Sequence, residues 1–378
     1  AVEFVGQPDY EIAQWFKLHL HPESMTSSAP GSTIEIPPLP TGVSLLQVYS
    51  TFLRFMYQST SGFFEETTPG GSNIWQRLEP HATLVFAVPN GWDLVQQNIL
   101  KQAALMAGIV RSEDDAALRM EFVTESEASV QYILRKSSII PWLREGSTFA
   151  VVDAGGSTVD STVFKCLAMS PKMILKMVGI SKCMQAGGVF VDRSAHVMLK
   201  EKLKGSDYGD EITVTDMVSE FERKAKRLFN GTSDSNIIQF GSRRDNDRNF
   251  GIIQGKITLN RLEVAGIFED TIRSIVNSCM ELLKGQNVKN LILVGGFGES
   301  PYLRNRLKAD LGPRGVEVTI AEEPLKKAAA EGSSSWYLQQ LLGNKVAPFT
   351  LGVESTLPFD QNRRDHRERR ARAYIADE

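Results

Sequence analysis

Short apolar runs alternate along the chain with longer segments in which apolar residues recur every three or four positions. The runs predict buried strands, and the helical spacing predicts amphipathic helices. Strands that alternate with helices in two blocks, meeting near Thr148, predict a two-lobed α/β fold. We expect strands at 82–88, 120–123, 149–152, 159–166, 173–178, 290–294 and 316–320. We expect helices at 43–57, 94–107, 127–136, 193–203, 218–229, 260–283, 301–307 and 324–342.

Polar and proline-rich segments separate these elements. Residues 24–42 contain four prolines among serines and threonines, so we expect a loop there. Residues 63–80 are polar and contain glycine, which predicts a loop with a short helical part. Residues 236–240 and 249–253 flank a charged turn, and we expect them to form a hairpin. The chain opens on Ala1 with a strand-like segment, which indicates a fragment or a processed form.

The amino-acid composition argues against several classes of protein, among them nucleic-acid-binding, disulfide-rich and membrane-spanning proteins. The 378 residues carry 42 basic and 45 acidic side chains, and this net charge of −3 predicts no general affinity for nucleic acid or anionic membranes. The three cysteines are widely separated, which favours a reducing compartment over a disulfide framework or a zinc site. No apolar run approaches the roughly 20 residues of a membrane span. We therefore expect a soluble, cytoplasmic protein of about two to three domain-sized units.

The segment 149–160 carries the first candidate chemistry. An apolar strand delivers Asp153 into the turn Gly155-Gly-Ser-Thr158. Glycines permit positive φ and leave backbone N–H groups uncovered, so such a turn can bind an anion, with the two hydroxyls as further donors. A tight hairpin with an exposed aspartate is the alternative interpretation.

A second glycine turn follows another buried strand. Residues 290–294 lead into Gly295-Gly-Phe-Gly298, after which a helix begins with Ser300 as its cap and Pro301 at its first position. A strand that leads through glycines to a helix N-terminus can hold a nucleotide against bare backbone. An ordinary connection between a strand and a helix, the alternative, needs one glycine rather than three.

Together, the two stretches resemble the ATPase domain of the 70-kDa heat-shock protein family, and in particular its divergent, fungal-type branch related to the twelfth heat-shock group. They are Val152-Asp-Ala-Gly-Gly-Ser-Thr-Val-Asp160 and, about 140 positions later, Leu293-Val-Gly-Gly-Phe-Gly-Glu-Ser-Pro-Tyr-Leu303. The resemblance covers about residues 2–354. It implies a two-lobed actin-like ATPase (ribonuclease H-like) fold with ATP or ADP between the lobes, and protein clients or co-chaperones as partners.

The resemblance also implies a catalytic set and a magnesium ion. Asp153 matches a ligand to magnesium-bound water, and Thr158 a hydroxyl near the γ-phosphate. Glu125 matches a second carboxylate, although Ser126 replaces the proline that follows it in the family. Lys17 matches the cation that reaches the γ-phosphate. From the residues alone, Lys17 also fits a surface lysine with a buried stem, and Glu125 a helix cap.

The nucleotide contacts follow from the same resemblance. It assigns the phosphates to Gly155, Gly156, Ser157, Gly187 and Gly188, and the adenosine to Gly295, Gly296, Phe297, Lys226 and Arg227. Glu222 lies one residue out of register with the family's ribose-binding acid. For the basic segment around Lys226 a solvated helix face is the alternative, and for Gly187 a plain turn.

Two departures bear on hydrolysis. The superfamily's opening Asp-x-Gly-Thr-Thr hairpin, which cradles the other side of the triphosphate, is absent from these 378 residues, so we expect a fold incomplete at its N-terminus. Ser157 replaces a third glycine, and its Cβ would cost roughly 1–2 kcal/mol if φ is positive there. We expect an ATP hydrolase that is slow or impaired. A non-catalytic pseudo-ATPase scaffold and a small-molecule kinase of the same fold stay open as alternatives.

The motifs also suggest domain boundaries. We assign residues 1–148 to the first lobe and 149–344 to the second, which carries the phosphate and adenosine turns. Residues 346–354 look like the family's passage into a β-domain, so we assign 345–378 to a linker-like start of that domain and a charged tail. The six arginines between 363 and 372 are typical of a solvated or disordered tail rather than a nucleic-acid site.

Overall fold

The computed structural model divides by its internal contacts into Ala1–Val346 and Ala347–Glu378, and the following description concerns the first unit. The expected strand at 1–6, most of the loop at 24–42 and the linker-like segment lie outside the described residues. The predicted lobe boundary near Thr148 falls inside the first unit. The structure describes residues 10–22, 25, 36–136, 142–170, 173–320, 328–339, 342–344, 360 and 362–364.

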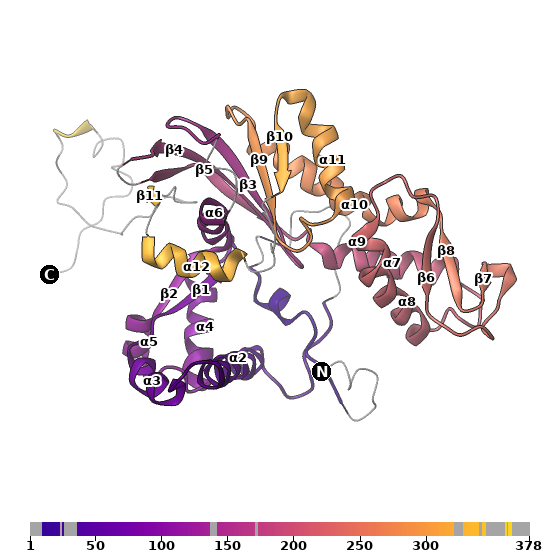
Figure 1. Cartoon of the computed structure of the whole chain (residues 1–378), viewed down its shortest axis with the longest axis horizontal. Helices are drawn as coiled ribbons and strands as arrows, with labels where there is room; N and C mark the ends of the chain where they lie inside the picture. The colour runs from indigo at the N-terminus through magenta and orange to yellow at the C-terminus, as the bar shows by residue number, and fades with distance from the viewer. Residues whose placement is uncertain are drawn as a thin grey trace. The chain divides into compact units, whose positions relative to one another are not determined.

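A six-stranded mixed sheet, in the order β10-β9-β3-β4-β5-β11, carries most of the core (Figure 1). Strands β3, β9 and β10 run parallel to one another, β4 is antiparallel to both β3 and β5, and β11 is parallel to β5. The expected α/β class is therefore confirmed. The strands are β3 Thr148–Ala154, β4 Val159–Ala168, β5 Ile174–Met184, β9 Asn290–Val294, β10 Glu317–Ile320 and β11 Leu342–Asn344.

Helices cover both faces of β3, which is why this strand is apolar from Phe149 to Val152. Ala150 and Val152 face a core built with α7 (Gly188–Lys202), α10 (Arg261–Leu282) and α11 (Pro301–Leu311). Phe149 and Val151 face a second core, built with α6 (Glu125–Lys136). Because successive side chains point to opposite faces, Asp153 lies on the α6 side.

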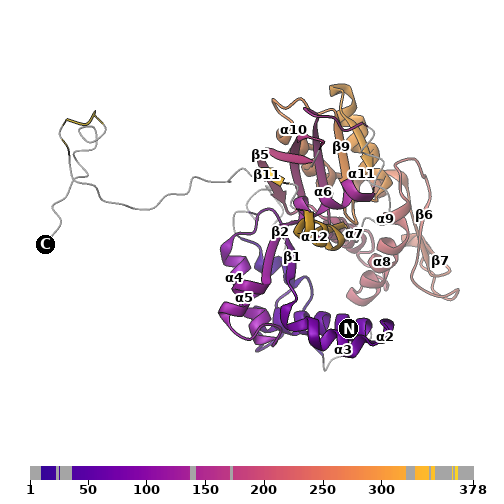
Figure 2. The same ribbon diagram turned by 60° about the vertical axis from the view of Figure 1, so that its left-hand side comes forward.

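The N-terminal block contains a parallel strand pair, β1 and β2, with helix α4 in the connection between them. Helix α12 packs against α6 and β1, and both views show it beside them (Figures 1 and 2). A Cβ on Gly332 of α12 would overlap the Ala128 carbonyl of α6, so this contact requires glycine. The elements are η2 Phe16–Leu20, α2 Leu45–Thr67, α3 Gly71–Leu78, η3 Glu79–His81, β1 Leu84–Val88, α4 Leu94–Met106, α5 Glu113–Arg119, β2 Met120–Thr124 and α12 Ala328–Gln339.

A separate three-stranded sheet, in the order β6-β8-β7, packs with α8. The hairpin expected between 236–240 and 249–253 is wrong, because β6 pairs with β8 along its whole length and β7 is a two-residue strand. The elements of this part are α8 Glu211–Arg223, α9 Ala225–Leu228, β6 Asn236–Gln239, η4 Arg248–Phe250, β7 Ile252–Ile253 and β8 Lys256–Leu259, and a short η5 Gly312–Arg314 follows α11.

Three helices differ from their expected bounds by five or more residues. Helix α2 continues ten residues past 57, where Thr60 and Thr67 hydroxyls bond to carbonyls four residues earlier and Phe64 packs on Trp75. The helix expected at 218–229 starts at 211 and breaks at Lys224. Helix α7 begins at Gly188 rather than 193, so its N-terminus lies directly at the glycine pair.

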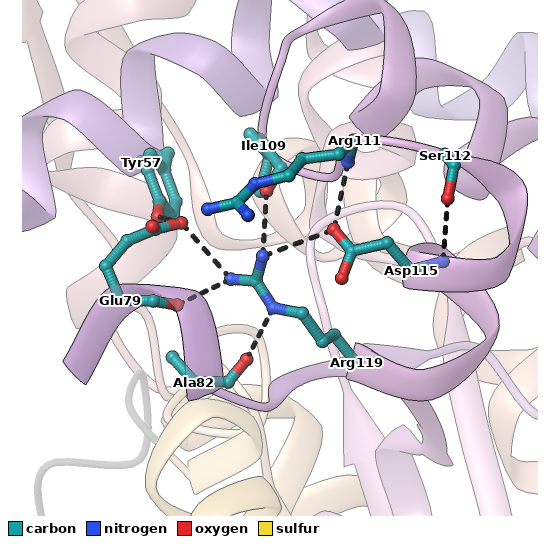
Figure 3. A network of polar contacts seen from close by, with 8 residues as sticks. All are labelled: Tyr57, Glu79, Ala82, Ile109, Arg111, Ser112, Asp115 and Arg119. Atoms are coloured by element: carbon teal, nitrogen blue, oxygen red, sulfur yellow. Dashed lines mark hydrogen bonds and ion pairs between the residues drawn. The ribbon is translucent and has the colours of Figure 1, made fainter. Parts of the chain in front are cut away.

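Arg119 ties the N-terminal block together (Figure 3). Its guanidinium donates to the carbonyls of Ala82 at 3.0 Å and Glu79 at 2.9 Å, and it forms ion pairs with Glu79 and Asp115 at 3.3 and 3.4 Å. The residue is only 6% exposed. One buried cation therefore joins the end of α5 to η3 and to the chain entering β1.

Arg119→Met should lower the free energy of unfolding by about 1–3 kcal/mol, because it leaves two half-buried carboxylates and two backbone carbonyls without their partner. Urea unfolding followed by circular dichroism measures this change. Arg111→Met is the matched control, since Arg111 is exposed, and it should stay within about 0.5 kcal/mol of the parent. Equal effects of the two changes would contradict the role given to Arg119.

Candidate functional site

The parallel register of β3 and β9 brings the two glycine turns together. Asp153 pairs with Val294, so the turns that follow these residues leave the same edge of the sheet. The N–H groups of Phe297 and Gly298 both donate to the Ala154 carbonyl, at 2.8 and 3.1 Å. Gly295 has a φ of 84°, and a Cβ there would overlap Asp153 Oδ1. Glycine at 295 is therefore required by conformation and by space.

The third glycine turn supports the central one. The amides of Gly187, Gly188 and Val189 donate to the carbonyls of Ser157, Gly155 and Gly156, at 3.2, 3.0 and 2.9 Å. A Cβ on Gly187 would overlap the Gly156 backbone. These bonds occupy the amides of both Gly187 and Gly188, so a direct phosphate contact by either N–H group stays a prediction.

Ser157 does not have the conformation that would penalise its side chain. Trp15 and Gln254 are the non-glycine residues with positive φ in the described part of the chain, and Gly155 and Gly156 also lie outside that region. The cost foreseen for Ser157 therefore does not arise. The Gly155 amide closes the turn by donating to the Thr158 carbonyl at 2.9 Å.

Asp153 is held beside helix α6. It is 8% exposed, and its Oδ2 accepts a hydrogen bond of 2.7 Å from the hydroxyl of Ser129. Thr158 is 2% exposed at the far side of the same turn. The sequence patterns gave no indication of Ser129, although its position one turn after Glu125 follows from helical spacing.

Asp160 is a second buried carboxylate that the motif assignment left without a role. It lies directly opposite Asp153 in the β3–β4 pair, so both side chains share one face. Its Oδ1 accepts from the backbone amide of Asn90 at 2.7 Å, and the Asn90 side chain donates to Ser126 Oγ at 2.8 Å. The loop after β1 is thereby joined to both α6 and β4. The sequence contained a signal for this role of Asp160: in a hairpin centred on the 155–158 turn, residue 160 lies opposite residue 153.

Lys17 and Glu125 form an ion pair of 2.8 Å between η2 and the start of α6. The structure thus brings together two residues that are 108 positions apart and were both assigned to catalysis. Burial lowers the pKa of Lys17, but the neighbouring Glu125 and Asp160 together with Cys183 outweigh this effect, and the pKa is raised. Lys17 therefore carries a full positive charge at neutral pH.

Burial is also the largest influence on the pKa values of the two aspartates, Asp153 and Asp160. It raises the pKa of Asp153 to about 7, with a further contribution from Glu125, while the Ser129 hydroxyl and Lys17 act in the opposite direction. Burial and Glu125 likewise raise the pKa of Asp160 to about 7. Three carboxylates near one lysine make the site electronegative, and an added cation would relieve that charge.

The residues assigned to adenosine lie on α9 and the second glycine turn. Lys226 pairs with Asp192 Oδ2 of α7 at 2.6 Å, and its Nζ would be 3.2 Å from a Cβ on Gly188. Arg227 is exposed. The Phe297 ring is 5% exposed and stacks on Phe268, so it supports the turn from the core side, whereas a Cβ on Gly296 would meet nothing within 4 Å.

Comparison with known proteins agrees with this arrangement. No family model matches the chain. Human heat shock 70 kDa protein 12A is 28% identical over 246 residues, which cover 56% of this chain and 35% of that protein. The chain is a divergent relative of the 70-kDa heat-shock proteins. Its mixed α/β architecture is consistent with their actin-like ATPase fold.

Two further relatives carry names from the same group of chaperones. Human heat shock 70 kDa protein 12B is 26% identical over 247 residues, covering 56% of this chain and 34% of that protein. Chaperone protein dnaK3 of Synechococcus elongatus is 23% identical over 289 residues, covering 73% of this chain and 36% of that protein. The matched part of this heat-shock-70 relative thus spans about a third of the length of these proteins.

Gly295→Ala should destabilise the protein by at least about 1–2 kcal/mol, the cost of positive φ for an L-residue, and its Cβ would also displace Asp153. Gly296→Ala is the matched control, because a Cβ at the next position meets open space. Thermal unfolding of the two variants measures the difference. Similar melting temperatures would show that the turn does not require glycine at 295.

Asp153→Asn should stabilise the protein above pH 7. The raised pKa means that the folded state binds this proton more tightly than the unfolded chain, so the free energy of unfolding falls as the pH rises from about 4 to about 7, and the loss is complete above pH 7. The variant's advantage should be on the order of 1–4 kcal/mol at pH 8 and should disappear toward pH 4. Urea unfolding across this range measures it, with exposed Asp216→Asn as control. A pH-independent difference would contradict the assignment.

Proposed function

We propose that this chain contains an ATP-binding, chaperone-like ATPase domain of the heat-shock-70 type, from the divergent branch that includes the twelfth group. The observation that carries the proposal is the meeting of three glycine turns around one buried carboxylate, Asp153, with the Lys17–Glu125 ion pair nearby. In the proposed arrangement, the phosphates lie at the 155–158 turn, and the adenosine lies between α9 and the 295–297 turn.

Magnesium fits the chemistry of these residues. Asp153 and Asp160 present buried carboxylates on one face of a hairpin, and oxygen ligands are those that Mg²⁺ prefers. Among the described residues no group of three or more His, Cys, Asp or Glu could hold a metal ion by itself. The ion would therefore be held by nucleotide phosphates and by water hydrogen-bonded to Asp153. It would supply charge neutralisation on the phosphate oxygens.

The chain's own residues would position and polarise the phosphates. The Thr158 hydroxyl and Lys17 ammonium would lie toward the γ-phosphate, and Asp153 and Glu125 would orient the attacking water. We propose that hydrolysis is slow. Lys17 is engaged by Glu125 at 2.8 Å, and the pKa of Asp153 is about 7.

The second candidate is a pseudo-ATPase scaffold, favoured by the internal use of the Gly187 and Gly188 amides. It predicts a folded chain with weak or absent nucleotide binding. A small-molecule kinase predicts turnover that requires a sugar or similar acceptor. Under the chaperone proposal, the partners are protein clients or co-chaperones, and the protein works in the cytoplasm. Among the described helices, none combines the length and hydropathy needed to span a membrane.

Gly296→Val should abolish nucleotide binding without unfolding the protein, because a Cβ at 296 meets nothing within 4 Å and the side chain would extend into the space proposed for adenosine. Isothermal calorimetry with ATP or ADP and Mg²⁺ measures binding. Gly62→Val, at an equally open position on α2, is the matched control and should bind like the parent. Binding by the parent that survives Gly296→Val would place the nucleotide elsewhere. A folded parent that binds neither nucleotide would favour the scaffold.

A further inference from the structure

The outer edge of the six-stranded sheet carries an open pocket that the proposed nucleotide site does not use. Its volume is about 520 Å³, and it is lined by Arg304, Lys308 and Gly312 together with residues 316–320. Strand β10 ends the sheet and pairs with β9 alone among the described strands. An edge strand presents unpaired N–H and C=O groups, so it can receive another strand.

The register shows which backbone groups are free to pair. The Glu317 amide donates to the Lys289 carbonyl at 2.8 Å, so residue 317 faces β9. Because successive residues of a strand direct their backbone groups to opposite sides, Thr319 also faces β9, whereas Val318 and Ile320 face outward. The two outward residues offer donors and acceptors to an added strand.

The charge beside this edge is positive. Arg304 and Lys308 have no ion-pair partner among the described residues, whereas Arg306, on another side of α11, pairs with Glu269 at 2.7 Å. Glu317 contributes one carboxylate to the lining, so the pocket keeps an excess of one positive charge. Arg304, Lys308 and Gly312 are spaced at i, i+4 and i+8, which places the two cations along one side of the helix.

The spacing of the cations fits an extended acidic chain. Four residues of helix advance about 6 Å, and two residues of strand advance about 6.6 Å. Helix α11 connects two parallel strands, so it runs back alongside β10 (Figure 1). Acidic side chains at alternate positions of a strand added to β10 would therefore lie on one face and meet the two cations in turn.

We propose that the β10 edge binds an extended peptide segment of a partner protein with acidic residues at alternate positions. Backbone pairing with Val318 and Ile320 supplies part of the affinity, and Arg304 and Lys308 select acidic side chains. This interaction is independent of the proposed nucleotide site, and its test needs no nucleotide.

The test is fluorescence anisotropy with the full chain and a labelled peptide, Thr-Glu-Val-Glu-Thr-Glu, at low and high salt. Lys308→Glu should weaken binding about tenfold and reduce its salt dependence, because it reverses a charge next to the peptide. Lys256→Glu makes the same charge change at an exposed position on β8 and should leave binding unchanged. A peptide with lysine in place of glutamate should not bind.

Backbone pairing has its own readout. Hydrogen exchange should show new protection at the Val318 and Ile320 amides when the peptide binds, with no gain at Thr319, which already faces β9. N-methylation of the peptide amides that pair with β10 should weaken binding about tenfold, and methylation of the alternate amides should not. The proposal is overturned if the peptide fails to bind at millimolar concentration, or if methylation of the pairing amides and of the alternate amides changes the affinity equally. Tighter binding of a single-stranded oligonucleotide at this edge would overturn it as well.

Discussion

The burial of Asp153 is the constraint on which the rest of the site depends. Strand β3 lies between helices on both faces, so the Asp153 side chain near its end is almost completely shielded from solvent. A carboxylate in this position is costly when ionised, and the cost appears as a pKa near 7. Asp160 lies opposite on the same face and is raised for the same reason. Folding therefore places two carboxylates with raised pKa values next to each other, and clusters of perturbed pKa values are common in binding and catalytic sites.

Residues from distant parts of the chain moderate that cost. Ser129 donates to Asp153, Asn90 donates to Asp160, and the charge of Lys17 lowers the pKa of Asp153. These contacts come from η2, the loop after β1 and α6, so they also attach the N-terminal block to the central sheet. The same hydrogen bonds thus stabilise the fold and shape the site, and a change in one would alter both.

The sequence predicted the elements that depend on local pattern. The strands ending at Val88, Ala154 and Val294 and the cap of α11 at Ser300 are close to their expected places, because apolar runs and glycine turns specify them locally. Other features depend on tertiary contacts and could not be predicted in the same way. The pairing of β6 with β8 and the bond from Asn90 to Asp160 each join segments whose proximity no local pattern encodes. Ser157 is a further example. The comparison with a third glycine suggested a positive φ, whereas the hydrogen bond from the Gly187 amide to the Ser157 carbonyl accompanies a backbone conformation outside that region.

Helix α11 shows how one element divides its charges between two tasks. Its first turn follows the glycine loop and is fixed by the Ser300 cap, with the Gly298 amide bonded to Ala154. Arg306 is satisfied against Glu269 of α10, which anchors the middle of the helix to the core side. Arg304 and Lys308 gain nothing comparable from the described residues, and they lie beside a strand edge that is also unpaired. Within the described part of the chain, neither the two unpaired cations nor the unpaired strand edge contributes to the stability of the fold. A bound acidic strand would pair with the edge and neutralise the cations, which explains why the two features lie side by side.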